Sequence, residues 1–355
     1  MKKKIITLAV AAALAPAAAF ADVTVYGQAH MSLDSHSGNG GTTATGTQDG
    51  MQLTSNSSRL GFKGTINLDG GMKALYQYEA SVALDGSGNG TIFNGTRDSY
   101  LGLAGGFGTV MTGRLPLANQ YVYDVNYFAD QVGDAGNFAI VGNATGGRIS
   151  RALAYATPDM GGFSGLVAFV PNTQESVTGV QAAPNKQSSY TLRGTYGAGP
   201  VFAAVSYQSI GVAGAQDAKL TVTSLAATFD FGAGNAGVQY TRNGANSQAT
   251  GGASTTQNVI TAGVSFKVSD GNSVKAQYSK AAESVSNAKD GGSMIAVGFD
   301  HNLSKSTTVY VAFAKVTNDT GAGFSASGWG HGGVGGPAVP GNDPSAVSFG
   351  AVYKF

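Results

Sequence analysis

The side chains with the clearest chemical potential in this sequence are arginines rather than nucleophiles. Arg59, Arg97 and Arg114 each stand in a stretch where apolar and polar residues alternate. Alternation at every second residue predicts a strand with one apolar and one polar face. With Tyr100 and Met111 assigned to the apolar face, Arg97 and Arg114 fall on the polar face. Guanidinium groups gathered on a wall that faces water attract carboxylates, phosphates and other anions.

Lys63 follows Arg59 by four residues and therefore shares its polar face. Counting from the adjacent turns predicts that the three arginines stand at about 25, 20 and 17 Å above one rim of the sheet. Their similar heights favour a single basic patch. The alternative for any one charge is a solvated wall residue without a selective role, which we favour for Lys73, Lys275 and Lys354.

The elements that carry these residues are predicted to be strands almost throughout. Period-two alternation gives about sixteen strands and hence an all-β fold. We place them at residues 22–35, 50–68, 71–84, 96–104, 108–115, 148–157, 162–170, 187–197, 200–209, 219–231, 235–243, 257–268, 272–283, 292–301, 306–317 and 345–355.

The connections alternate between short turns and long polar segments. The short ones are 69–70, 105–106, 158–161, 197–199, 232–234, 269–271 and 302–305. This alternation is typical of a transmembrane antiparallel up-and-down β-barrel, with short periplasmic turns and long external loops. A tilted strand of about ten residues spans the apolar band, and sixteen strands leave room for an aqueous channel. The long connections are 36–49, 85–95, 116–147, 171–186, 210–218, 244–256, 284–291 and 318–344.

Composition and the N-terminus agree with an exported barrel. Lys2 to Lys4, an apolar run from Ile5 to Ala15 and the small residues around Ala21 predict a cleaved signal peptide at residues 1–21. Residues 22–355 then form one barrel domain. Charged residues are 12% of the chain, which contains 54 glycines and no cysteine. The net charge of +1 and the lack of a run of basic residues in 22–355 argue against nucleic acid as a partner.

Catalytic and metal-binding motifs find little support. None of the four histidines stands at metal-ligand spacing. The stretch 232–237 matches the dinucleotide fingerprint, but it joins two strands with no helix after it, so we favour a hairpin turn. No nucleophile elbow or zinc-protease motif is present. We therefore expect no catalytic residue, no cofactor and no metal, with an outer-membrane barrel enzyme as a distant alternative.

Several motifs, in this order and spacing, resemble those of the trimeric general porins of Gram-negative bacteria, most of all their β-proteobacterial branch. The resemblance runs through nearly the whole of residues 22–355. Its carriers are 22–27 (DVTVYG), 58–64 (SRLGFKG), 70–79 (GGMKALYQYE), 97–103 (RDSYLGL), 106–110 (GFGTV), 113–114 (GR) and 353–355 (YKF).

The resemblance implies a homotrimer in which the third external loop, about residues 115–147, folds into the barrel and narrows it. It also implies that acidic residues of this loop face a basic ladder on the wall. Asp124, Asp130 and Asp134 are the loop candidates, and Arg59 and Arg97 match ladder positions. Arg148 matches less closely, with Arg151 as its alternative.

These observations together predict a bacterial outer-membrane porin for passive diffusion of small hydrophilic solutes and ions. Its other partners would be outer-membrane lipid and lipopolysaccharide. Basic wall residues slightly outnumber the acidic loop residues, which favours a weak anion preference, although Glu79 also faces inward and could reverse it. A substrate-specific channel for a sugar or an organic anion is the main alternative.

Overall fold

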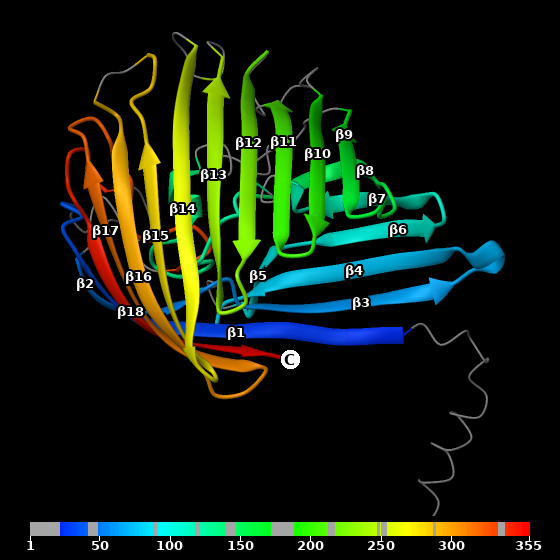
Figure 1. The fold of residues 1–355 in the computed structure, drawn as a ribbon, viewed down its shortest axis with the longest axis horizontal. Coiled ribbons are helices and arrows are strands. Elements are labelled where there is room, and N and C mark those ends of the chain that lie inside the picture. The colour runs from blue at the N-terminus through cyan, green and yellow to red at the C-terminus, as the bar shows by residue number, and fades with distance from the viewer. Residues whose placement is uncertain are drawn as a thin grey trace, which may run out of the picture.

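The strands form one closed antiparallel ring (Figure 1). The computed structural model describes residues 22–41, 49–87, 91–117, 121–139, 147–171, 188–211, 217–246, 249, 254–286, 289–332 and 338–355. The predicted signal peptide at residues 1–21 lies outside them. The last strand, β18 (Ser345–Lys354), pairs with the first, β1 (Asp22–Ser37), through ten residue pairs from Gln28–Lys354 to Ser37–Ser345. The pairing closes the sheet, so every strand has a partner on both sides.

Two of the sixteen barrel strands are each interrupted once, so each is divided into two shorter segments. β2 (Gly50–Ser55) and β3 (Arg59–Asn67) pair with successive parts of β1 and together form one barrel strand. β5 (Phe93–Thr96) and β6 (Ser99–Gly105) do the same along β4 (Lys73–Val82). The described residues therefore form a sixteen-stranded barrel, which confirms the predicted fold class.

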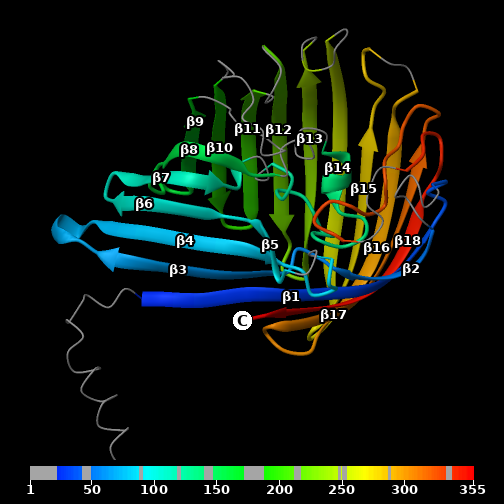
Figure 2. The same ribbon diagram turned by 180° about the vertical axis from the view of Figure 1, so that it is seen from behind.

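The predicted strands match the observed ones to within a few residues, because apolar and polar residues alternate along each strand. Neighbours in sequence pair with each other around the ring, as Figure 2 shows from behind. The other strands are β7 (Gly108–Leu115), β8 (Ile149–Ala156), β9 (Phe163–Val170), β10 (Ser189–Ala198), β11 (Val201–Gly211), β12 (Lys219–Asp230), β13 (Gly234–Ala245), β14 (Thr255–Ser269), β15 (Asn272–Ala281), β16 (Gly292–Asn302) and β17 (Thr307–Asn318).

The two faces of the wall differ in chemistry. Leu101, Leu153 and Leu225 project outward with more than half of their surface exposed. Alternate residues such as His30 and Ser224 are buried on the inner face. This pattern matches a wall that contacts lipid outside and a polar lumen inside. Within the described residues, no helix is long and apolar enough to cross a membrane.

The buried core lies inside the barrel, between the wall and the connection from β7 to β8, which we call L3 (residues 116–148). Tyr121, Phe128 and Phe138 of L3 are at most 1% exposed. They pack in two clusters against inward-facing wall residues such as Ala154 and Ala312. L3 carries the 3₁₀ helix η3 (Ala135–Phe138), and a second, η1 (Asp69–Gly71), forms the turn between β3 and β4. The observed course of L3 is therefore inward, as expected.

Candidate functional site

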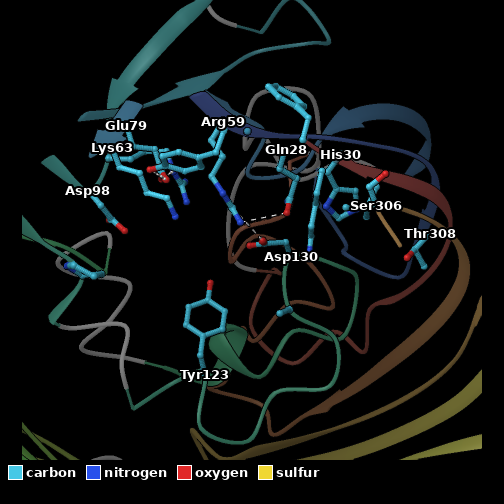
Figure 3. A pocket seen from close by; sticks show the side chains of 18 of the residues that line it. Gln28, His30, Arg59, Lys63, Glu79, Asp98, Tyr123, Asp130, Ser306 and Thr308 are labelled. Atoms are coloured by element: carbon cyan, nitrogen blue, oxygen red, sulfur yellow. Dashed lines mark hydrogen bonds and ion pairs between the residues drawn. The ribbon is translucent and has the colours of Figure 1, made fainter. Parts of the chain in front are cut away.

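A cavity of about 950 Å³ lies between L3 and the short-turn end of the barrel (Figure 3). Its walls come from β1, β3, β4, β18 and the connection between β16 and β17, and L3 forms one side. Both signs of charge face it. The basic lining residues are Arg59, Lys63, Arg97, Arg148, Lys305 and Lys354, and the acidic ones are Glu79, Asp98, Asp130 and Asp300.

Arg59 connects the wall to L3. Its guanidinium donates to the side-chain oxygen of Gln28 at 3.2 Å and to the backbone carbonyl of Ser57 at 3.2 Å. Nη1 also lies 3.8 Å from Oδ2 of Asp130 on L3, and dashed lines in Figure 3 join the guanidinium to Gln28 and to Asp130. The two wall contacts hold the arginine in place, so a fixed positive charge faces the acidic side of the passage.

Two further arginines are paired with carboxylates of the wall. Nε of Arg97 donates to Oε1 of Glu79 at 2.5 Å, and the Tyr26 hydroxyl donates to Oε2 at 2.9 Å. Nε of Arg148 donates to Oδ1 of Asp98 at 2.6 Å. These pairs neutralise much of the charge that each arginine brings to the lumen.

Three lysines give the cavity its positive excess. Among the described residues, no carboxylate lies within 4.0 Å of the ammonium groups of Lys63, Lys305 or Lys354. The Lys63 ammonium lies 4.9 Å from the centroid of the Tyr26 ring. All three residues lie toward the short-turn end, so the excess charge is concentrated at that side of the narrowing.

The predicted basic residues do not all gather in this cavity. Arg59, Lys63, Arg97 and Arg148 line it, whereas Arg114 is not among its described lining residues. Met111 and Leu115 both face L3 inside the barrel, so alternation places Arg114 on the opposite face from the one predicted, and the register also shifts between Gly113 and Leu115. The Arg114 guanidinium instead donates to the Thr96 carbonyl and the Ser150 hydroxyl.

The assignment of Tyr100 and Met111 to the lipid face was wrong. Both pack against the L3 cluster inside the barrel, and the Tyr100 hydroxyl donates to the lumen residue Gln77 at 3.3 Å. The break between β5 and β6 shifts the alternation of inward and outward side chains by one residue. Arg97 and Tyr100 can therefore both face inward.

The three predicted acidic residues of L3 have three different environments. Asp130 faces the cavity and Arg59. Asp124 points to the opposite wall, where both of its carboxylate oxygens accept from the guanidinium of Arg193 at 2.5 and 2.9 Å. Burial raises the pKa of Asp124, and the Arg193 partner opposes that rise. The three aspartates of L3 therefore differ in role: Asp130 lines the cavity, whereas Asp124 and Asp134 hold L3 in place.

Asp134 is fully buried inside L3 and organises its turn. Its carboxylate accepts from the amides of Gly136 and Asp130 and from the Asn126 side chain, each at 2.7 Å. Burial, together with the nearby Asp130 carboxylate, raises the pKa of Asp134 to about 8, although these donors oppose the shift. The residue therefore shapes the loop and does not face the cavity.

Two lysines that the sequence left as solvated wall residues have specific environments. Lys354 lines the cavity. Lys275 is 7% exposed, and its ammonium lies 3.0 Å from Oδ1 of Asp300, donates to Oε1 of Gln131 at 2.8 Å and lies 4.8 Å from the Phe128 ring centroid. Lys275 therefore anchors L3 to the wall. No local pattern distinguishes it from other wall lysines, because its L3 partners Gln131 and Phe128 lie more than a hundred residues away.

The hairpin predicted at residues 232–237 agrees with the structure, in which residues 231–233 join β12 to β13 and residues 234–237 begin β13. Among the described residues, no group of three or more His, Asp or Glu side chains is placed to hold a metal ion. The arrangement can bind and orient ions and polar solutes in a charged passage. A model of the family described as Gram-negative porin matches residues 7–321.

The chain belongs to the Gram-negative porin family. The major outer membrane protein P.IB of Neisseria gonorrhoeae is 34% identical to this porin over 189 residues, 50% of this chain and 51% of that protein. The match therefore spans about half the length of that relative. The P.IB protein of Neisseria lactamica is 28% identical over 351 residues, covering 92% of this chain and 97% of that protein.

The fold of this porin is also found among solved structures. The anion-selective porin from Comamonas acidovorans superposes with a TM-score of 0.74 and 22% identity, covering 94% of this chain and 100% of that one. At this identity the likeness concerns the fold. Family membership and the closed barrel place this porin in the bacterial outer membrane.

Proposed function

We propose that this porin forms a water-filled channel for passive diffusion of small hydrophilic solutes and ions, with a weak preference for anions. The observation that carries the preference is the charge of the cavity, where six basic and four acidic side chains of the described residues face the lumen. Arg59, Lys63, Arg97 and Arg148 would form the basic wall, with Asp130 as the acidic residue of L3. The preference is weak because three of these four basic side chains have carboxylate partners.

We further propose a homotrimer in contact with outer-membrane lipid and lipopolysaccharide. The outer face of the barrel supports this: Val23, Val25 and Phe349 on β1 and β18 expose 53–60% of their surface. Closed cyclic symmetry would bury part of this apolar belt. Cross-linking in the membrane followed by gel electrophoresis tests the number of subunits.

A channel with a binding site for one solute class is the second candidate. Tyr26 and Tyr123 line the same cavity as the charged residues, so an aromatic surface is available to a planar or sugar-like solute. An enzyme is disfavoured, because the charged groups are paired in ways that hold the wall and L3 rather than activate a nucleophile.

The test is a planar-bilayer recording of the purified, folded porin under a salt gradient. Large ohmic steps, a reversal potential on the anion side and little solute discrimination are expected. Block by micromolar amounts of one sugar or organic anion would replace diffusion with a solute-specific channel. Steps without any anion preference would reject the role given to the lysines and Arg59.

A further inference from the structure

The connection from β17 to β18 enters the barrel and contacts L3. We call residues 319–332 of this connection the strap. The amide of Gly133 in L3 donates to the carbonyl of Ala326 at 2.8 Å. The Phe324 ring stacks on Phe138 of L3 with 4.2 Å between centroids. The strap therefore packs on the loop that narrows the barrel, and none of its described residues is among those that line the cavity.

Trp329, the only tryptophan of the chain, contacts an L3 residue that lines the cavity. Its backbone amide donates to Oδ1 of Asn137 at 2.9 Å, and its indole Nε1 donates to the Tyr123 hydroxyl at 3.3 Å. The indole lies against Gly136 so closely that a Cβ there would stand 2.1 Å from Cδ1 of the ring. Tyr123 is 40% exposed and lines the cavity, with its hydroxyl toward the lumen in Figure 3.

The next residue of the strap approaches the acidic side of the constriction. A Cβ on Gly330 would stand 2.2 Å from Oδ1 of Asp130, and the φ of Gly330 is +65°. Asp130 is the L3 carboxylate that faces Arg59. Consecutive residues of the strap thus contact two of the L3 side chains that line the cavity, Tyr123 and Asp130.

The strap is held to the wall just beyond these contacts. His331 Nε2 lies 3.4 Å from Oδ1 of the fully buried Asp34 on β1. The amide of Gly332 donates to Oδ1 of Asn56 at 2.9 Å. Oδ2 of Asp34 accepts from two wall hydroxyls, those of Ser32 and Thr54. The anchor is therefore rigid, and a displacement of the strap requires that these buried contacts break.

We propose that Trp329 is a positioning residue of the constriction: the strap, anchored through His331 to Asp34, holds Tyr123 and Asp130 at the positions that set the width and charge of the passage. Trp329 touches no solute in this proposal and acts through Tyr123. The proposal rests on the channel function proposed above. Both side chains contact the strap as well as the rest of L3: the Tyr123 hydroxyl accepts from the Trp329 indole, and the Asp130 carboxylate lies against Gly330.

The first experiment compares Trp329→Ala, Trp329→Phe and the wild type in planar bilayers. Trp329→Ala is expected to raise single-channel conductance about twofold and to change the reversal potential, because Tyr123 and Asp130 lose their support. Trp329→Phe keeps a ring on Gly136 and is expected to fall between the two. Phe169→Ala is the matched control, since Phe169 lies on the outer face and is 47% exposed. Unchanged conductance and reversal potential in Trp329→Ala would overturn the proposal.

A double-mutant cycle separates positioning from general loosening. Trp329→Phe and Tyr123→Phe remove the two sides of one hydrogen bond, so their effects on conductance are expected to be non-additive. Additive effects would mean that the indole does not act through Tyr123. The cycle uses conservative variants and stays decisive if Trp329→Ala does not assemble.

Fluorescence of the single tryptophan tests the position of the strap independently of channel conductance. Trp329 is 8% exposed, so iodide is expected to quench wild-type emission weakly. His331→Gln and Asp34→Asn are each expected to increase quenching about twofold, because the anchor is lost. Strong quenching in the wild type would overturn the proposal. A wild-type barrel that does not conduct but shows weak quenching would instead reject the channel function and leave the strap in place.

Discussion

Nη1 of Arg59 lies 3.8 Å from Oδ2 of Asp130, and this pair joins the barrel wall to the loop inside it. The arginine is fixed by Gln28 and Ser57, and the amide of Asp130 donates to Asp134 within L3. Burial raises the pKa of Asp130, while the Arg59 guanidinium opposes that rise. Opposite charges held on two separate elements produce a transverse field across the passage, which orders water and favours polar solutes.

Neutralising Arg59 and neutralising Asp130 are expected to shift the ion preference in opposite directions. Arg59→Gln should lower the anion-to-cation permeability ratio about two- to threefold, because it removes a fixed positive charge from the lumen. Asp130→Asn should raise the ratio by a similar factor. Reversal potentials under a salt gradient measure both. Lys315→Gln changes the same charge on the outer face of β17 and should leave the ratio unchanged; an equal shift there would assign the effect to net charge alone.

Glu79 is predicted to restrain the anion preference. Glu79→Gln should raise the anion-to-cation ratio, because Arg97 then keeps its charge without a carboxylate at 2.5 Å. The same change should lower the free energy of unfolding by about 1–3 kcal/mol, since an ion pair becomes a hydrogen bond from the guanidinium to a neutral amide. Reversal potential and urea unfolding are the two measurements. Asp85→Asn, outside the cavity, is the control, and a fall in the ratio for Glu79→Gln would contradict the prediction.

Salt is expected to screen the unpaired lysines. At about 0.1 M salt the charges of Lys63, Lys305 and Lys354 act over roughly 10 Å, whereas at 1 M they act over about 3 Å. The anion preference should therefore decline as salt rises. The triple Lys→Gln variant should be less anion-preferring at low salt and should converge with the wild type at high salt. A difference that stays constant with salt would contradict this electrostatic origin.

The turn of L3 is expected to weaken in alkaline solution. The pKa of Asp134 rises from 3.8 to about 8 on folding, so the folded loop binds the proton more tightly than the unfolded loop does. This contribution to loop stability is complete below pH 3.8 and is lost as the pH rises through about 8. Hydrogen exchange of the Gly136 and Asp130 amides, corrected for intrinsic rates, should accelerate across that range. Asp134→Asn should remove the pH dependence, and an identical profile in the variant would contradict the assignment.

A charge introduced on the outer face is expected to lower the free energy of unfolding far more than a charge introduced in the lumen. Leu101→Lys places an ammonium against lipid and should lower the free energy of unfolding by about 2–4 kcal/mol. Gln77→Lys, on the neighbouring strand, places it in the cavity and should change stability by less than about 1 kcal/mol. Urea unfolding in lipid vesicles compares them. Equal losses would contradict the assigned faces.

The sequence alone was enough to predict the barrel, its strands and the inward course of L3 by resemblance. The two-residue period is a local property, since each residue meets either lipid or water according to its place on the strand. Short and long connections alternate along the chain for the same reason. Arg59 and Lys63 could be placed on the inner face because the alternation of β3 is unbroken between them.

Tertiary structure decided which charges meet. Arg114 was misplaced because Met111, the residue from which its face was counted, packs inside the barrel, and the break before β6 shifts the alternation of side chains along that strand. Asp124 and Asp134 have the same residue type as Asp130, yet one meets Arg193 and the other is enclosed by L3. The strap reaches L3 from nearly two hundred residues away. Such contacts depend on the closed ring and on the path of the loops within it, which no local pattern encodes, because the partners become neighbours only when the barrel closes.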